Sequence, residues 1–165
     1  MGHAAVGRRG GSAAEHCGGA ARRACGRAPR GPRRAVIYLD TSVALAQLLA
    51  EDRRPPAQLW QEPLVSSRLL EYELWTRLHA RGLGASHGEA ARLLLARIAF
   101  LELARPVLAR ALEPFPTPVR TLDALHLASM DFLRGLGQDA PMASYDDRLV
   151  AAARAIGVGV YDLGP

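Results

Sequence analysis

Acidic residues of this chain stand where structural elements are expected to meet. Asp40 directly follows the apolar run VIYL, and both Asp146 and Asp147 directly follow PMASY. Asp123 lies in the first turn of a helix that the pattern predicts over 121–137. In an open α/β sheet, the working crevice lies beyond the carboxyl ends of the strands. We therefore expect these acids to face one edge of a sheet.

A further acid comes from the stretch RLLEYELWTR, in which Glu71 and Glu73 are both candidates. Helical projection places Leu70, Leu74 and Leu78 on one stripe, and both glutamates lie near the margins of that stripe. Periodicity alone does not decide which glutamate faces the crevice.

Carboxylates gathered in one cleft repel each other. A pair about 4 Å apart costs roughly 4 kcal/mol at an effective dielectric constant of about 20, and a helix N-terminus offsets only about 0.3 to 1 kcal/mol. Protons or metal ions must therefore neutralise the cluster. Oxygen ligands without cysteine favour Mg²⁺ or Mn²⁺, and such ions can activate water and orient a phosphodiester. The acids thus indicate metal-dependent phosphodiester hydrolysis.

The residue types that are missing exclude several other chemistries. The sequence contains no lysine, whereas a P-loop and an aspartyl-phosphate site each need one. Both cysteines, Cys17 and Cys25, precede the expected folded part, which excludes a disulfide framework there.

Strand and helix patterns alternate from about residue 35 onward. Strands are predicted over 35–39, 63–67, 99–103, 141–145 and 158–163. Helices are predicted over 41–51, 57–62, 68–81, 106–115, 121–137 and 146–157, and another begins at Ser86. Strands separated by helices predict the α/β class, with a parallel sheet covered by helices on both faces.

Polar residues mark the expected helix starts. Ser42 and Thr121 are expected to cap the helices that they open. Ser86, with Glu89 three residues later, matches a capping box. His126 shares a helical stripe with several leucines, so we interpret it as a core histidine.

Charge is unevenly distributed along the chain. The total is +5, but residues 1–35 carry eight arginines and one glutamate, a net +7 that leaves −2 for the rest. Residues 1–35 contain few large apolar side chains, so burial cannot offset the entropy that is lost on ordering. We therefore predict that this segment is disordered. We expect a true start near Val36, and a transit peptide or a nucleic-acid-binding arm are the alternatives.

The expected compartment follows from the same features. No window of the sequence has the apolar length of a membrane span, and the N-terminus lacks the apolar core of a signal peptide. The part predicted to fold has no cysteine. We therefore expect a reduced, cytoplasmic protein that does not enter a membrane.

Four blocks of the sequence resemble the PIN-domain nucleases, and most closely the VapC-type toxins of bacterial toxin–antitoxin modules. They are VIYLDTSVAL, SSRLLEYELWTRL, RTLDALHLA and ASYDDRLVAAARAIGVGVY, in this order. The resemblance covers roughly residues 36–163. It implies a PIN-like fold over 36–165, with a central parallel sheet of four to five strands, helices on both faces and four acids that hold Mg²⁺ or Mn²⁺.

The resemblance also implies which acids form the site. Asp40 matches the acid of the first block, Asp123 that of the third and Asp146 that of the fourth, with the adjacent Asp147 as its alternative. In the second block, the resemblance selects Glu73. These four acids are the predicted catalytic and metal-binding residues.

The implied activity is endoribonuclease cleavage, with tRNA or ribosomal RNA as plausible substrates. A metal-activated water would attack the RNA phosphodiester in line, and nearby arginines would bind phosphates; the candidates are Arg68, Arg77, Arg81 and Arg148. The resemblance further implies a cognate antitoxin and a homodimer. The alternatives are an RNA-processing nuclease without an antitoxin and a noncatalytic module whose acidic cleft binds an arginine-bearing segment. A small upstream gene for a DNA-binding protein would favour the toxin.

Overall fold

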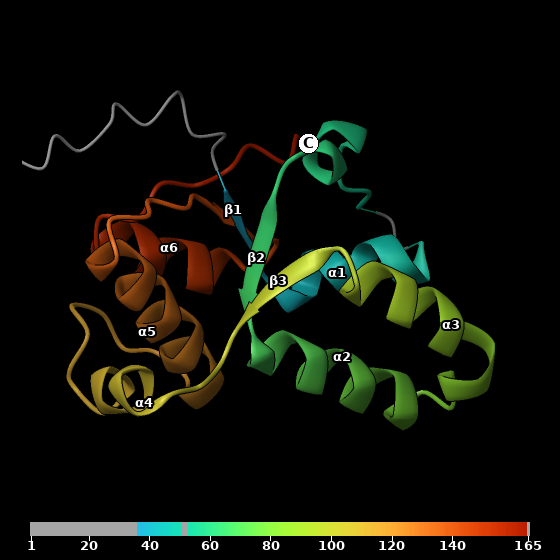
Figure 1. The fold of residues 1–165 in the computed structure, drawn as a ribbon, viewed down its shortest axis with the longest axis horizontal. Coiled ribbons are helices and arrows are strands. Elements are labelled where there is room, and N and C mark those ends of the chain that lie inside the picture. The colour runs from blue at the N-terminus through green and yellow to red at the C-terminus, as the bar shows by residue number, and fades with distance from the viewer. Residues whose placement is uncertain (1–35, 51–52, 165) are drawn as a thin grey trace, which may run out of the picture. The chain divides into compact units, whose positions relative to one another are not determined.

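The computed structural model describes residues 36–50 and 53–164, and helices flank a small central sheet (Figure 1). The predicted arm over 1–35 lies outside the described residues. The strands are β1 (Ile37–Leu39), β2 (Leu64–Ser67), β3 (Ile98–Leu101) and β4 (Met142–Ala143). The helices are α1 (Thr41–Leu49), the 3₁₀ helix η1 (Ala57–Gln61), α2 (Arg68–Ala80), α3 (Gly84–Leu95), α4 (Arg105–Ala111), α5 (Thr121–Gly135) and α6 (Asp147–Ala155).

The sheet of the described residues has the strand order β3-β2-β1-β4, and every neighbouring pair is parallel. From β1 the chain moves outward through β2 to β3, and it then crosses to the other side of β1 to form β4. The strand order therefore reverses between β1 and β4, which is where parallel α/β sheets form their binding crevice. Leu39 and Ala143 are paired there, so both strands end side by side.

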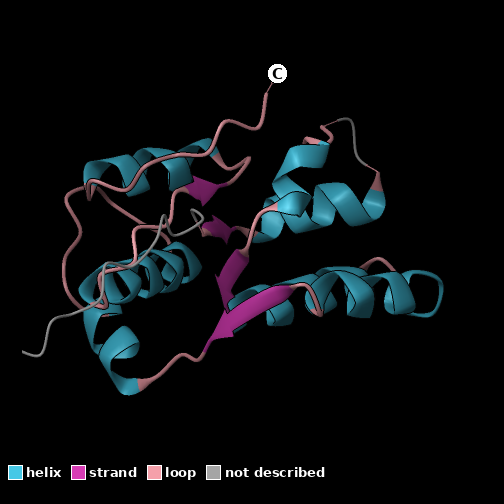
Figure 2. Ribbon diagram, turned by 45° about the horizontal axis from the view of Figure 1, so that its top comes forward, coloured by secondary structure: helices cyan, strands magenta, loops and turns pink. Residues whose placement is uncertain are grey.

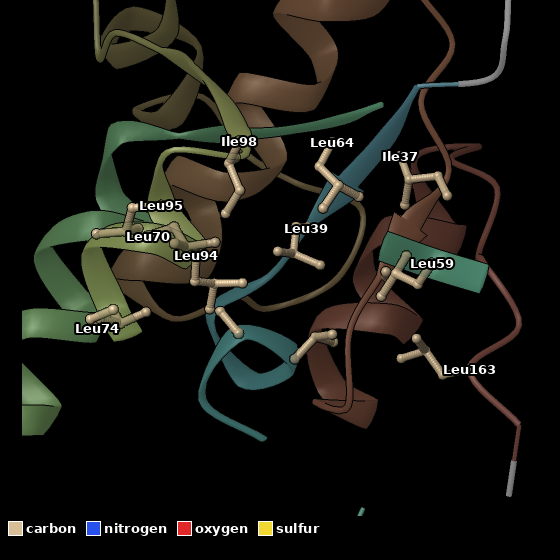
Figure 3. Close-up of a cluster of buried hydrophobic side chains, with 14 of the residues drawn as sticks. Ile37, Leu39, Leu59, Leu64, Leu70, Leu74, Leu94, Leu95, Ile98 and Leu163 are labelled. Atoms are coloured by element: carbon tan, nitrogen blue, oxygen red, sulfur yellow. The ribbon is translucent and has the colours of Figure 1, made fainter. Parts of the chain in front are cut away.

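Alternation along β1 sends side chains to two hydrophobic cores. Ile37 and Leu39 face the core that Figure 3 shows, which they share with Leu70 and Leu74 of α2. Tyr38 faces the opposite core, which contains residues of α5 and α6. Figures 1 and 2 show helices on both sides of the strands. The predicted α/β architecture with two covered faces is confirmed.

The last predicted strand, over 158–163, is wrong. This segment makes only an isolated parallel bridge between Met142 and Val160. Two backbone hydrogen bonds join it to Met142, from the Met142 N–H to Gly159 and from the Tyr161 N–H to Met142. Because β4 is itself only two residues long, it offers too short an edge for a further strand.

The three predicted helix caps are also wrong. The side chain of Asp40, and not that of Ser42, caps α1. Helix α5 begins at Thr121 without a side-chain cap, and α3 already begins at Gly84. Thr121 is thus the first residue of α5 and Ser86 lies within the first turn of α3, so neither occupies the cap position.

None of the helices in 36–50 and 53–164 combines the length and the apolar character that a membrane span requires.

Truncation of a core leucine tests whether the leucine stripe of α2 stabilises the fold. Leu74 is fully buried, so Leu74→Ala should lower the free energy of unfolding by about 2 to 5 kcal/mol. Leu112→Ala is the control, because that side chain is 89% exposed, and it should change the free energy by less than about 0.5 kcal/mol. Urea unfolding measures both values, and equal effects would contradict this assignment of the core.

Candidate active site

The four predicted acids line one cleft of about 870 Å³. Asp40 follows β1, Glu73 lies in α2, Asp123 in the first turn of α5, and Asp146 directly precedes α6. The described structure thus brings together residues that lie more than 100 positions apart. Asp147 does not line this cleft and is exposed.

Asp40 is held at the end of β1 by its neighbours on α1 and after β4. Its Oδ2 accepts hydrogen bonds from the backbone N–H and the hydroxyl of Ser42. The Ser144 hydroxyl donates to the same oxygen over 2.8 Å. The backbone N–H of Asp40 also donates to the Ala143 carbonyl. Asp40 is therefore buried in a fixed orientation at the switch point of the sheet.

Asp146 caps the N-terminus of α6. Its Oδ1 accepts from the backbone N–H groups of Arg148, at 2.9 Å, and Leu149, at 3.2 Å. The backbone N–H of Asp146 donates to the Ser144 hydroxyl over 3.0 Å. Ser144 therefore joins Asp40 and Asp146, the acids that follow the two neighbouring strands.

Glu73 is the glutamate that faces the cleft, which resolves the choice that periodicity left open. Its Oε2 accepts from the Thr41 hydroxyl at 2.5 Å and lies 3.1 Å from His126 Nε2. Glu71 instead pairs with Arg68 on the outer side of α2. Leu74 is fully buried beside Glu73, and this packing turns Glu73 toward α1 and α5.

The pKa of Glu73 is lowered. Burial is the strongest single influence and would raise it, but hydrogen bonds with His126 and Thr41, together with the charges of His126 and Arg77, outweigh burial. Glu73 is therefore held as a carboxylate within the cleft.

The pKa of Asp123 is raised. Burial is the largest cause, and the negative charges of Asp146 and Asp40 add to it, while Arg120 opposes the shift. The acids are therefore close enough to repel one another, as the sequence predicted.

His126 is buried, as predicted, but it also contacts the acids. It is 2% exposed, and its Nε2 lies 3.1 Å from Glu73 and 3.8 Å from Asp40. Burial alone would lower the pKa of His126, but Tyr38, Glu73 and Asp40 together raise it to about 10. The sequence places His126 one turn after Asp123 on the same helix, but it gives no signal for the contacts with Glu73 and Asp40.

Arginines line the same cleft as the acids, namely Arg53, Arg77, Arg81 and Arg120. Sequence reasoning found Arg77 and Arg81 but missed the other two. Arg68 and Arg148 do not line the cleft; Arg68 is paired with Glu71 and Glu102. Arg53 lies in a loop and Arg120 directly precedes α5. At such positions the sequence has no periodicity that would indicate where a side chain points.

Among the described residues, no group of three or more His, Cys, Asp and Glu side chains is gathered closely enough to hold a metal ion in the present arrangement. The donor set nevertheless fits Mg²⁺ or Mn²⁺, because it consists of carboxylate oxygens without sulfur. Burial, together with repulsion from Asp146 and Asp40, raises the pKa of Asp123, and a bound cation would relieve the repulsion. Asp40, Glu73, Asp123 and Asp146 are the residues that would hold the ion.

Substitution can separate the role of Asp146 as the cap of α6 from its predicted role as a metal ligand. Asp146→Ala removes the cap of α6 and should lower the free energy of unfolding by about 1 kcal/mol. Asp146→Asn keeps an oxygen that can accept both N–H groups, so it should be nearly as stable as the wild type. Chemical denaturation measures the difference, with Asp147→Ala as the exposed control. Equal stability of the Ala and Asn variants would contradict the capping role.

The His126 cluster predicts a pH dependence of stability in the metal-free protein. The pKa of His126 is about 10 in the folded protein and ordinarily 6.5, so folding favours the protonated ring. Its contribution is complete below pH 6.5 and is lost as the pH rises toward about 10. The free energy of unfolding, measured with EDTA across this range, should fall more steeply in the wild type than in His126→Gln. Parallel curves for the two proteins would contradict the raised pKa of His126.

Comparison with known proteins agrees with this geometry. The family model described as PIN domain matches residues 37–155. Ribonuclease VapC46 of Mycobacterium tuberculosis is 34% identical over 130 residues, which cover 76% of this chain and 96% of that protein. Ribonuclease VapC47 of the same species is 31% identical over 129 residues, which cover 74% of this chain and 93% of that protein.

A solved structure shows the same fold. The crystal structure of VapC20 of Mycobacterium tuberculosis, described as a toxin that cleaves the sarcin–ricin loop, superposes with a TM-score of 0.53 at 22% identity. The match covers 70% of this chain and 94% of that chain. The family model and the curated relatives span most of the described residues. This chain therefore belongs to the PIN-domain family, in the group of VapC-type ribonucleases.

Proposed function

We propose that this chain is a metal-dependent endoribonuclease that hydrolyses RNA phosphodiester bonds and acts as the toxin of a toxin–antitoxin pair. The observation that carries the proposal is the cleft in which four acids from four separate segments meet, with arginines on the same walls. Its relatives VapC46 and VapC47, which are named ribonucleases, support the choice of RNA as substrate.

The hydrogen bonds of the acids suggest how each could serve as a ligand. Within the described part of the chain, every hydrogen bond to the Asp40 carboxylate falls on Oδ2, and the bonds to Asp146 fall on Oδ1. Those to Glu73 fall on Oε2. One oxygen of each of these three acids is thus used for positioning, and the other remains available for Mg²⁺ or Mn²⁺. A bound ion would supply an activated water and stabilise the leaving oxygen.

The arginines of the cleft would bind the RNA backbone. Arg53, Arg77 and Arg120 line the cleft beside the acids, and the chain after residue 35 carries a net charge of −2. Nonspecific affinity for nucleic acid comes mainly from contacts between cations and phosphates. Substrate affinity must therefore come from these local cations and the metal, and it should weaken as salt concentration rises.

The proposal includes the partners and location expected of such a toxin. Residues 36–165 would form the nuclease domain, in the cytoplasm, with a cognate antitoxin that blocks the cleft and a second copy that completes a homodimer. Exposed apolar side chains support protein contacts: Leu93 of α3 is 64% exposed, and Leu112 after α4 is 89% exposed. A tRNA or a ribosomal RNA that contains the sarcin–ricin loop is a suitable first substrate.

RNA cleavage tests the proposed function directly. Purified protein should cleave members of a panel of tRNAs and ribosomal RNA with Mg²⁺ or Mn²⁺, and EDTA should stop the reaction. Asp40→Asn removes a ligand charge and should lower the rate by more than about 100-fold, since outer-shell changes alone typically cost about 10 to 100-fold. Gel analysis of end-labelled RNA measures these rates.

Asp147→Asn is the matched control, because Asp147 is the adjacent acid outside the cleft. It should cleave at close to the wild-type rate, whereas Asp146→Asn should lose activity. Cleavage that persists in both EDTA and Asp40→Asn would overturn the proposed mechanism.

A further inference from the structure

We propose that His126 is a positioning residue of the active site, which holds the Glu73 carboxylate ready for metal binding through a buried hydrogen-bond chain. This inference rests on the proposed function, because Glu73 is a ligand only if the cleft binds a metal.

The contact with Glu73 is direct and specific to one oxygen. His126 Nε2 lies 3.1 Å from Glu73 Oε2, and the Thr41 hydroxyl donates to the same oxygen at 2.5 Å. The side chain of Glu73 is 18% exposed, while that of His126 is 2% exposed. Two donors from α1 and α5 therefore hold Oε2 from the protein side, and Oε1 is left for the cleft.

The other ring nitrogen of His126, Nδ1, contacts the hydroxyl of a buried tyrosine. His126 Nδ1 lies 2.9 Å from the Tyr38 hydroxyl, and the backbone N–H of Ser67 donates to that hydroxyl over 3.2 Å. The rings of Tyr38 and His126 meet edge to face. Tyr38 and Ser67 are both fully buried, so β1 and the end of β2 set the orientation of the imidazole.

This arrangement determines which nitrogen donates to Glu73. Near Nδ1 lie the hydroxyls of Tyr38 and Ser67, which can donate or accept. Among the described residues, the polar partners of Nε2 are the carboxylate oxygens of Glu73 and Asp40, which accept when ionised. Nε2 therefore carries a hydrogen whether the ring is neutral or protonated, and the inference does not depend on its protonation state.

The identity of the Nε2 partner distinguishes His126 from a histidine that is merely buried. The hydroxyls at Nδ1 could satisfy one side of the ring, whereas Nε2 meets the predicted ligands from α2 and from the end of β1. Partners that orient metal ligands typically contribute about 10 to 100-fold in metal affinity or activity. His126 has the place and the geometry of such a partner.

Two substitutions of His126 separate its two nitrogens. The amide nitrogen of Gln extends about as far from Cα as Nε2 does, and that of Asn about as far as Nδ1. His126→Gln can thus still donate to Glu73, whereas His126→Asn can contact only Tyr38. Mn²⁺ binding to the purified full chain, measured by calorimetry without RNA, should weaken about 10-fold in His126→Asn and less than about threefold in His126→Gln.

A double-mutant cycle tests whether His126 acts through Glu73. In a Glu73→Gln background, His126→Asn should cause no further loss of Mn²⁺ affinity, because the group that it positions no longer carries the ligand charge. Leu133→Ala is the control for general destabilisation. Leu133 is buried on the same helix α5 but belongs to the core with Tyr38 and Met142, so its truncation should leave Mn²⁺ affinity unchanged.

The outcomes distinguish this inference from the proposed function. A wild type that binds no Mn²⁺ and cleaves no RNA would overturn both. A wild type that binds and cleaves, together with a folded His126→Asn that binds equally well, would overturn only the positioning role, and so would an equal loss in the Glu73→Gln background. If His126→Asn does not fold, Tyr38→Phe should weaken Mn²⁺ binding, and unchanged binding would overturn the role.

Discussion

Repulsion among carboxylates is the constraint on which the rest of this structure depends. Four acids share one cleft. The pKa of Asp123 is raised there, chiefly by burial and further by the charges of Asp146 and Asp40. The protein holds them together with hydrogen bonds that each use one oxygen. Ser42 and Ser144 bind Asp40, two backbone N–H groups bind Asp146, and Thr41 and His126 bind Glu73. Ordered acids that still repel one another are suited to accept a cation.

The sheet supplies the scaffold for this arrangement. Because β1 and β4 are parallel neighbours that end at Leu39 and Ala143, the residues that follow them lie close together. Two buried cores hold the strands in this register, one with α1, α2 and α3 and the other with α5 and α6. The same helices carry the remaining acids, so packing and chemistry depend on the same contacts. A loss of core packing under α2 should therefore also disturb Glu73.

Much of the fold followed from local pattern, but the last strand and the helix caps depended on partners in space. Short apolar runs predicted β1 to β4, and the order of strands and helices predicted a parallel sheet with two covered faces. The segment 158–163 has the same apolar pattern but forms only one bridge, because the short β4 gives it almost nothing to pair with. Ser42 was a reasonable cap by type, yet its hydroxyl instead donates to Asp40, which is the actual cap. Partners of this kind depend on distance in space and not on residue type.

The sequence by itself determined the chemistry of the site: acids at strand ends and helix starts, no lysine, and blocks that resemble the PIN family. Periodicity could not choose between neighbouring acids, and only the resemblance had selected Glu73 and Asp146. The tertiary structure decided which acid of each pair lines the cleft. Glu73 faces the cleft because the buried leucines of α2 fix the rotation of that helix, and Asp146 lies there because it caps α6 beside Ser144. Likewise, a pattern of leucines identified His126 as buried, but its contact with Glu73 required α5 to pack against α2. Periodicity identifies the buried face of a helix, whereas the packing of helices determines which residues that face contacts.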